Sequence, residues 1–131
     1  MVSFLGDPIM ATTRILIVDD IPQVREDLHT LLTLAGDIEV VGEAINGLDG
    51  VRQASAVRPE VVLMDLEMPV LDGYEATRQI KTLDPACRIV ALTVHDDEDT
   101  RQKAIRAGVD DFIVKGAPVE SLVQAITERK E

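Results

Sequence analysis

The sequence predicts an α/β fold in which five β-strands and five α-helices alternate, (βα)5, and form one doubly wound parallel sheet. Short, continuous apolar runs rich in Val and Ile recur along the chain, as is typical of strands buried on both faces. Between these runs, apolar residues recur at helical spacing. Because the two patterns alternate throughout, we expect a parallel sheet with helices on both faces.

The composition agrees with one domain that has a sizeable core. The chain has 131 residues, 46% of them hydrophobic, and a formal net charge of −11. Such an acidic chain is a poor binder of nucleic acid, because contact with phosphates needs cationic surface. No apolar run approaches the roughly 18–20 residues that span a bilayer, and the first residues do not resemble a signal peptide. We therefore expect a cytoplasmic domain that binds neither membranes nor nucleic acid directly.

Five apolar runs are the predicted strands. Four of them are continuous: Ile15–Val18, Val61–Met64, Ile89–Leu92 and Phe112–Val114. The remaining run, Ile38–Val41, contains Glu39, and this mixed pattern suits an edge strand. Residues 1–13 show no periodicity and are expected to form a loose leader, which leaves 14–131 as the predicted domain.

The first three predicted helices have an apolar stripe or a capping signal. The first has one stripe, formed by Val24, Leu28, Leu31, Leu32 and Ala35. Asn46 is a suitable N-cap for the second helix. Asp72 followed by Glu75 resembles a capping box at the start of the third.

The last two predicted helices differ in how well they can be packed. Acidic residues 97–99 favour the start of the fourth helix, and Pro118 suits the first position of the fifth. The fourth helix has the thinnest apolar stripe, with Ile105 as its one large apolar residue among alanines. We expect it to be the least firmly packed helix.

The polar residues after the apolar runs indicate a site. Asp19 and Asp20 follow the first run, Asp65 the third, Thr93 the fourth and Lys115 the fifth. Ligands of open parallel sheets bind at the carboxyl ends of the strands. These five side chains are therefore expected to meet at one edge of the sheet.

Three carboxylates in one place repel one another. Two unit charges 4 Å apart interact by about 4 kcal/mol at an effective dielectric constant of 20. Either their pKa values rise or a cation binds among them. Mg²⁺ suits such an oxygen-only site better than zinc, and the ammonium of Lys115 suits an oxygen of an incoming anion.

Taken singly, these residues also have ordinary structural explanations. Asp19 or Thr93 alone could be a helix cap, and Lys115 alone a solvated surface charge. His95 could shuttle a proton or be an exposed loop histidine, and Cys87 is expected to be a small residue near a strand start with no redox task. Only the combination, a suitable group at the end of four strands, favours a functional site.

Four sequence motifs closely resemble the receiver domain of bacterial response regulators. They are Ile-Leu-Ile-Val-Asp19-Asp20, Val-Leu-Met-Asp65-Leu-Glu67-Met-Pro-Val-Leu-Asp72-Gly73, Leu-Thr93 and Phe112-Ile-Val-Lys115. The resemblance covers Arg14 to Arg129, and the stretch around Asp65 is very specific. It implies a flavodoxin-like fold with a five-stranded sheet of order 2-1-3-4-5.

The resemblance also implies the chemistry. Asp65 would accept a phosphoryl group from a sensor histidine kinase or phosphotransfer protein. Asp20, Asp65 and the backbone carbonyl of Glu67 would ligate Mg²⁺, and Asp19 would reach the metal through water. The domain would catalyse only its own phosphorylation and dephosphorylation, so it is not expected to be an enzyme in the usual sense.

A second set of implied roles concerns the response to phosphorylation. Lys115 would pair with Asp65 and then with the phosphoryl oxygens. Thr93 would move to hydrogen-bond the phosphate, and Phe112 would follow as the switch aromatic. We expect the surface from Thr93 to Phe112, together with residues 118–129, to be remodelled.

The sequence departs from the family pattern at three places. Lys115 is followed by Gly116 where the family usually has proline, often after a cis peptide, and a non-proline cis bond costs about 2.5–4 kcal/mol. Val94 is larger than the residue many members have there and is expected to narrow access to the site. Glu67 and His95 occupy positions that vary across the family, and together with Val94 they are expected to tune dephosphorylation.

Two other functions are compatible with parts of the pattern. An aspartate-nucleophile phosphohydrolase also uses magnesium and a lysine, but it typically carries a second Asp where this chain has Glu67. A degenerate receiver acting as a docking module would not need every acceptor, metal and lysine position to be filled. The stretch Lys115–Leu122 resembles receivers that precede a helix-turn-helix output domain, so a homodimer or a C-terminal DNA-binding domain outside this chain is the expected output.

Overall fold

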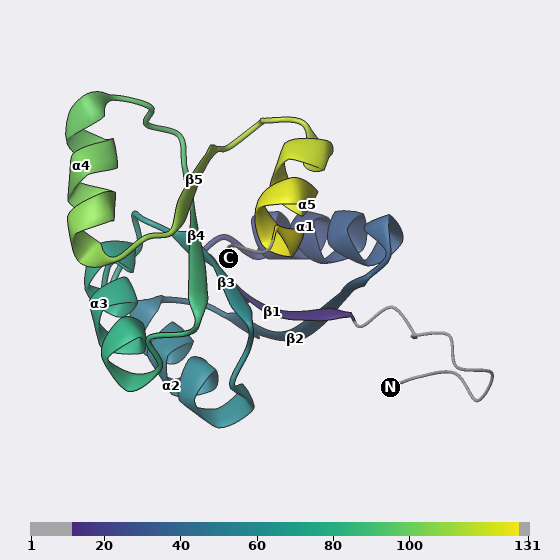
Figure 1. Ribbon diagram of the computed structural model, residues 1–131, viewed down its shortest axis with the longest axis horizontal. Helices are drawn as coiled ribbons and strands as arrows, with labels where there is room; N and C mark the ends of the chain where they lie inside the picture. The colour runs from purple at the N-terminus through teal and green to yellow at the C-terminus, as the bar shows by residue number, and fades with distance from the viewer. Residues whose placement is uncertain (1–11, 129–131) are drawn as a thin grey trace.

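The structure, a computed structural model, describes residues 12–128 and contains one five-stranded parallel sheet. The strand order is β2-β1-β3-β4-β5, as predicted (Figure 1). The elements, in chain order, are β1 (Thr13–Val18), α1 (Pro22–Ala35), β2 (Ile38–Ala44), α2 (Gly47–Val57), β3 (Val61–Asp65), α3 (Gly73–Leu83), β4 (Arg88–Thr93), α4 (Glu98–Ala107), β5 (Asp111–Val114) and α5 (Val119–Thr127). Most of the predicted leader, residues 1–11, lies outside the described residues, and Thr13 already belongs to β1.

Helices cover both faces of the sheet, which explains the continuous apolar runs. α1 and α5 lie on one face, and α2, α3 and α4 lie on the other (Figure 1). In β1, Ile15 and Ile17 pack into the first core cluster, with Leu32 of α1 and Ile126 of α5. The alternate residues of the same strand pack into a second cluster towards α2 and α3. A strand buried on both faces needs apolar side chains at every position.

The two predicted N-caps, Asn46 and Asp72, are confirmed, Asp97 is a further N-cap, and one helix start is shifted. The side chains of Asn46, Asp72 and Asp97 each accept a hydrogen bond from a backbone N–H in the first turn of their helix. Pro118 is the N-cap of α5 rather than its first helical residue. Its ring fixes φ but not ψ, and a ψ of 145° places it just outside the helix.

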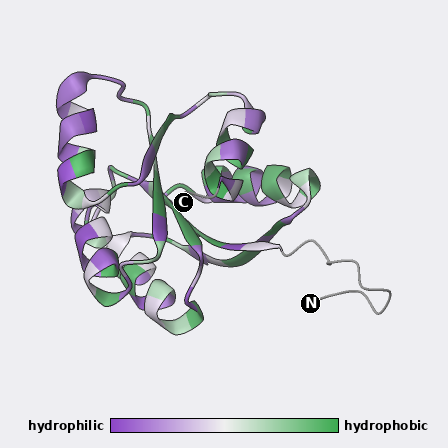
Figure 2. Cartoon of the chain, viewed as in Figure 1, coloured by the Kyte–Doolittle hydropathy of each residue, from purple (hydrophilic) through white to green (hydrophobic). Residues whose placement is uncertain are grey.

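α4 is packed even more thinly than its sequence indicates. Ile105 is 60% exposed, so the prediction that it belongs to the buried apolar stripe was wrong. The buried residues of α4 are Ala104 and Ala107. In Figure 2 α4 is largely hydrophilic, whereas the strands are largely hydrophobic. The stripe of α1 is also narrower than predicted, because Leu31 is 46% exposed and Leu32 is its one fully buried residue.

Two further observations concern the backbone of the described residues. Over residues 12–128, no helix combines the length and the apolar character that crossing a membrane requires. The described residues contain no cis peptide bond, so the bond between Lys115 and Gly116 is trans, and Gly116 has a φ of +94°.

Candidate functional site

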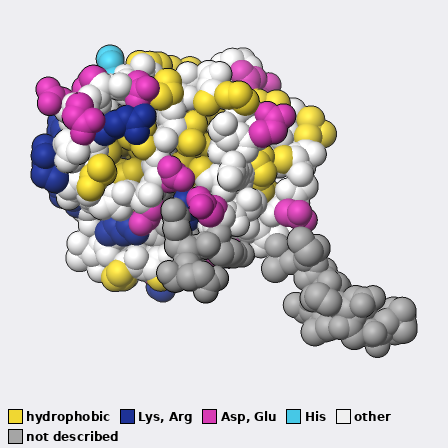
Figure 3. All heavy atoms as spheres, turned by 45° about the horizontal axis from the view of Figure 1, so that its top comes forward, with side chains coloured by type: hydrophobic (Ala, Val, Ile, Leu, Met, Phe, Trp, Pro, Cys, Tyr) yellow, Lys and Arg dark blue, Asp and Glu magenta, His cyan; other side chains and the backbone are white. Residues whose placement is uncertain are grey.

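The three predicted carboxylates meet at the carboxyl edge of the sheet. Asp19 and Asp20 directly follow β1, Asp65 is the last residue of β3, and one carboxylate oxygen from each lies within 4.8 Å of the other two. The side chains differ in burial, since Asp19 is 1% exposed and Asp65 4%, whereas Asp20 is partly exposed. Figure 3 shows further acidic side chains gathered at the upper left, over the end of the molecule where α4 begins.

Lys115 provides the cation of this cluster. Its Nζ lies 3.1 Å from Oδ2 of Asp19 and 3.5 Å from Oδ2 of Asp65. Burial lowers the pKa of Lys115, but the charges of Asp65 and Asp19 outweigh burial, so the pKa is raised and the side chain stays charged. The sequence predicted a partner in Asp65; the structure adds Asp19 as the closer one.

The pKa of Asp65 is raised to about 6 from an ordinary value of 3.8. Burial is the main cause, and the charge of Asp19 adds to it. The backbone N–H of Glu67, which donates to Oδ1 of Asp65 at 3.2 Å, and the ammonium of Lys115 act in the opposite direction. Asp65 is therefore short of positive charge, and an oxygen-only donor set of this kind fits a hard divalent cation.

The close approach of α3 to β3 explains the glycine in the motif around Asp65. The N–H of Gly73 donates to the carbonyl of Leu66 at 3.1 Å. A Cβ at position 73 would lie 2.2 Å from the backbone oxygen of Asp65, which is shorter than any allowed contact. Only glycine lets the helix begin directly against the end of the strand.

The two predicted switch residues lie on adjacent strands. Thr93 is 1% exposed at the end of β4, and its Oγ1 accepts a hydrogen bond from the N–H of His95 at 3.0 Å. The carbonyl of Thr93 accepts from the N–H of Lys115 at 2.7 Å, which joins it to the end of β5. Phe112 is half-buried under α4, and the guanidinium of Arg101 lies 4.6 Å from the centre of its ring.

The three residues predicted to tune dephosphorylation lie at the exposed mouth of the site. Nε2 of His95 is 3.1 Å from Oε2 of Glu67, so the loop after β3 and the loop after β4 are joined across the site. The side chain of Val94 is 63% exposed. These positions agree with a location at the entrance, and their roles stay predictions.

One residue at the site was not found from the sequence. Arg25 of α1 donates through a guanidinium nitrogen to the backbone carbonyl of Asp19 at 2.7 Å. Nothing in the apolar pattern distinguishes this arginine from a solvated helix charge, because the contact depends on how α1 folds back on the end of β1.

The fold and the buried acidic cluster beside a lysine define a class of protein, and comparison with known proteins identifies it. The family model described as the response regulator receiver domain matches residues 15–127, so the chain belongs to this family. The predicted resemblance is thereby confirmed. The chain is a receiver domain of response regulators.

Individual relatives are similar over most of this chain. The response regulator protein VraR of Staphylococcus saprophyticus is 36% identical over 113 residues, which are 86% of this chain and 54% of VraR. The response regulator GacA of Pseudomonas viridiflava is also 36% identical, over 86% of this chain and 53% of GacA. The chain thus spans about half the length of these curated relatives.

Solved structures of related proteins have the same fold. A two-component response regulator of the LuxR family from Aurantimonas has a TM-score of 0.84 and 38% identity, covering 88% of this chain and 83% of that one. The receiver domain of the putative response regulator NarL from Mycobacterium tuberculosis has a TM-score of 0.83 and 27% identity, covering 91% and 99%.

Proposed function

We propose that the chain is a signalling switch in which Asp65 accepts a phosphoryl group from a sensor histidine kinase or phosphotransfer protein. The observation that carries the proposal is a buried Asp65 with a raised pKa that lies beside Lys115 and clusters with two further carboxylates. A carboxylate oxygen of Asp65 would attack the phosphorus as the phosphorus–nitrogen bond to the donor histidine breaks. Phosphoryl transfer needs mainly positioning and neutralisation of charge.

The residues present fit Mg²⁺. Asp20, Asp65 and the backbone carbonyl of Glu67 would hold it, and Asp19 would reach it through water. When bound, Mg²⁺ would neutralise part of the charge of the carboxylates and the phosphoryl group. Lys115 lies within reach of Asp65 and would hold a phosphoryl oxygen, while Asp19 keeps the ammonium in place.

The experiment uses acetyl phosphate with Mg²⁺ and intact-mass measurement. Wild type should gain one phosphoryl group, and Asp65→Asn should gain none. Asp96→Asn, an exposed aspartate in the loop after β4, is the matched control and should be phosphorylated like wild type. Phosphorylation of Asp65→Asn, or none of wild type, would contradict the assignment.

Metal binding has its own measurement. Titration with Mg²⁺ should shift the amide signals of Asp20, Asp65 and Glu67 in a ¹H–¹⁵N spectrum. Unchanged signals at these residues up to millimolar Mg²⁺, about the range in which open oxygen-ligated sites fill, would contradict the metal site.

The proposed output is a change of surface. Phosphate on Asp65 would offer Thr93 a charge-assisted hydrogen bond, and α4, held by Ala104 and Ala107, has few buried contacts that oppose movement. We expect residues 93–112 and 118–129 to rearrange and to support a homodimer or contact with a C-terminal DNA-binding domain outside this chain. Hydrogen exchange with and without phosphorylation should change in these segments; unchanged protection there would contradict the proposal.

The remaining expectations complete the function. The domain would catalyse only its own phosphorylation and dephosphorylation, at rates tuned by Glu67, Val94 and His95. It would work in the cytoplasm, without direct contact to nucleic acid or membrane.

A further inference from the structure

The guanidinium of Arg25 lies between two strands next to the acidic cluster. One of its terminal nitrogens donates to the backbone carbonyl of Asp19 at 2.7 Å, and its Nε lies 3.6 Å from Oε1 of Glu43 in β2. The side chain is only 14% exposed, although arginine usually keeps its head in water. Arg25 therefore connects α1 to the ends of β1 and β2.

The bond from Arg25 completes the hydrogen bonding of Asp19. The N–H of Asp19 donates to the carbonyl of Ala44 at 3.1 Å. Its Oδ1 accepts from the N–H of Ile21 at 2.9 Å and its Oδ2 from Lys115 at 3.1 Å. With Arg25 on the carbonyl, the backbone and both carboxylate oxygens of Asp19 are held.

The carbonyl of Asp19 and the N–H of Asp20 belong to one planar peptide unit. The bond from Arg25 consequently orients the backbone that carries Asp20. Asp20 is the most exposed of the three carboxylates and lies beyond the end of β1, so the sheet does not position it. The orientation of this peptide plane therefore contributes to where the carboxylate of Asp20 lies relative to Asp65.

The partner of Arg25 is itself held in place. Nδ1 of His29 lies 2.7 Å from Oε2 of Glu43, and the side chain of Gln53 donates to the carbonyl of Glu43 at 2.8 Å. The planar guanidinium thus donates to the carbonyl of Asp19, just after β1, and forms an ion pair with Glu43 of β2, a geometry that a single ammonium cannot reproduce.

We propose that Arg25 is a positioning residue for the carboxylate cluster: it holds the Asp19–Asp20 peptide so that Asp20 and Asp65 can bind one divalent cation together. The inference rests on the proposed metal site and adds a residue that does not touch the metal. The proposal also predicts whether removal of Arg25 weakens or tightens binding of the divalent cation. A nearby positive charge by itself weakens cation binding, so its removal should tighten binding, whereas loss of positioning should weaken it.

The test measures the affinity for Mn²⁺ by electron paramagnetic resonance of the free ion. Arg25→Met keeps most of the apolar stem and removes the donors and the charge. Its dissociation constant should rise about tenfold, as is typical when an outer partner of a metal ligand is lost. Arg25→Lys, which keeps the charge and one donor, should restore part of this affinity. Arg52→Met, an exposed arginine of α2, loses the same charge and should bind like wild type.

A second variant and a second readout guard against a folding defect. Glu43→Gln leaves Arg25 in place and weakens its anchor, so the affinity should fall by a smaller factor, about twofold to threefold. In acetyl phosphate labelling, Arg25→Met should change two quantities relative to wild type. The Mg²⁺ concentration for half-maximal rate should rise by a larger factor than the factor by which the maximal rate falls. Circular dichroism at the same temperature would show that both variants are folded.

The outcomes separate the two proposals. Unchanged or tighter Mn²⁺ binding by folded Arg25→Met, with weaker binding by Asp20→Asn, would overturn the role of Arg25 and leave the metal site intact. If wild type binds no Mn²⁺, or if Asp20→Asn binds like wild type, the metal site itself is wrong and the role of Arg25 with it.

Discussion

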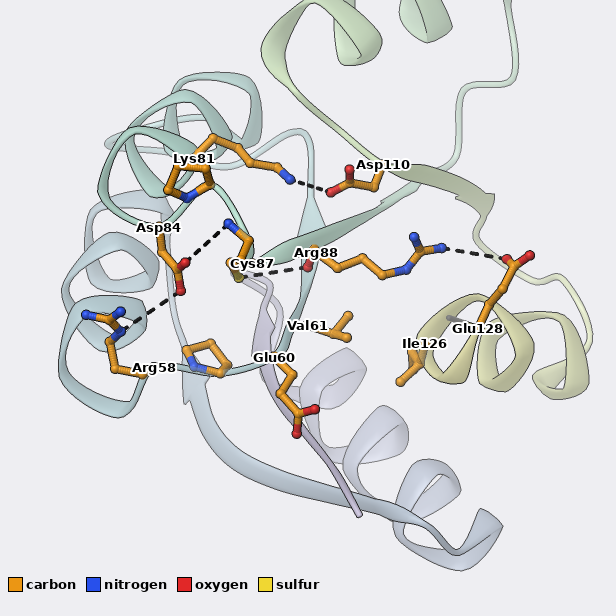
Figure 4. Close-up of a pocket in the computed structure, with 13 residues that line it drawn as sticks. Arg58, Glu60, Val61, Lys81, Asp84, Cys87, Arg88, Asp110, Ile126 and Glu128 are labelled. Carbon is orange, nitrogen blue, oxygen red and sulfur yellow. Dashed lines mark hydrogen bonds and ion pairs between the residues drawn. The ribbon is translucent and has the colours of Figure 1, made fainter. Parts of the chain in front are cut away.

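The two ends of the sheet differ in how their charged side chains are paired. At the amino end, a cavity of about 560 Å³ lies between the ends of α2, α3 and α5 and the starts of β3 and β4 (Figure 4). Its basic residues each meet an acidic one, in the pairs Lys81–Asp110 at 2.7 Å, Arg88–Asp111 at 3.2 Å and Arg58–Asp84 at 4.0 Å. At the carboxyl end, within the part of the chain that the structure describes, three clustered carboxylates have one ammonium as ion-pair partner.

This difference shows which property indicates a site. The amino end has a cavity of about 560 Å³, but each basic residue that lines it already has an acidic partner, and these pairs contribute to stability. The carboxyl end has three clustered carboxylates, two of them buried, beside one ammonium. A ligand that brings positive charge gains most where that charge is missing, so the charge balance, rather than the cavity volume, favours the proposed site at the carboxyl end.

The largest expected effect on stability is at the carboxyl end of the sheet, where the carboxylates outnumber the cations. The raised pKa of Asp65, about 6 against 3.8, means that folding disfavours its charged form, a cost of about 3 kcal/mol at neutral pH. Asp65→Asn should therefore raise the free energy of unfolding at pH 7.5, measured by urea in EDTA, by about 2–3 kcal/mol. The gain should shrink as pH falls from 6 to 4, because the folded wild type then binds the proton. A gain that is the same at pH 4 and pH 7.5 would contradict this account.

At the amino end of the sheet, removal of one member of a buried ion pair should lower stability. Arg88 is 13% exposed, pairs with Asp111 and Glu128, and donates to the carbonyl of Ala125 at 3.0 Å. Arg88→Ala should lower the free energy of unfolding by about 2 kcal/mol, since buried acceptors lose their donor. Arg58→Ala, whose side chain is 69% exposed, should change it by less than about 0.5 kcal/mol. Equal losses in both variants would show that the amino end is not held by buried pairing.

Lys115 and Lys81 allow a direct comparison of the carboxyl end of the sheet with the amino end. Without metal, Lys115→Ala should lower the free energy of unfolding by about 1–2 kcal/mol, because Asp19 and Asp65 lose their cation. Mg²⁺ should restore it and bind at least as tightly as to wild type, since a competing charge is gone. Lys81→Ala, at the amino end, should show a loss that Mg²⁺ does not repair. Phosphorylation and switching of Lys115→Ala that equal those of wild type would contradict its assigned role.

The smallest effect concerns backbone strain beside the site. Val70, in the loop after β3, has a φ of +73° and is 73% exposed, and β-branched residues rarely adopt this region. Val70→Asn should raise the free energy of unfolding by about 0.5–1 kcal/mol, since asparagine tolerates a positive φ. Val94→Asn replaces an exposed loop valine without a positive φ and should be neutral. A stabilisation of similar size in both would assign the effect to polarity.

Much of the fold could be predicted, and the errors have a common origin. Four continuous apolar runs and one mixed run located the five strands, and Asn46, Asp72 and Asp97 located three helix starts, because these signals are local. Ile105 was misplaced because its neighbours in sequence cannot tell which side of a short, mostly polar helix meets the sheet. The strand order came from the family resemblance, not from the pattern.

The sequence by itself determined which chemical groups end the strands, since Asp19, Asp65, Thr93 and Lys115 come directly at or after the apolar runs and a parallel sheet brings such ends together. Only the tertiary structure decided how these groups pair. The ammonium of Lys115 lies closer to Asp19, 96 residues away in the chain, than to Asp65, and Arg25 reaches the carbonyl of Asp19. Periodicity reports which face of an element is buried, whereas a contact of 3 Å depends on how far side chains from separate elements reach once they are packed.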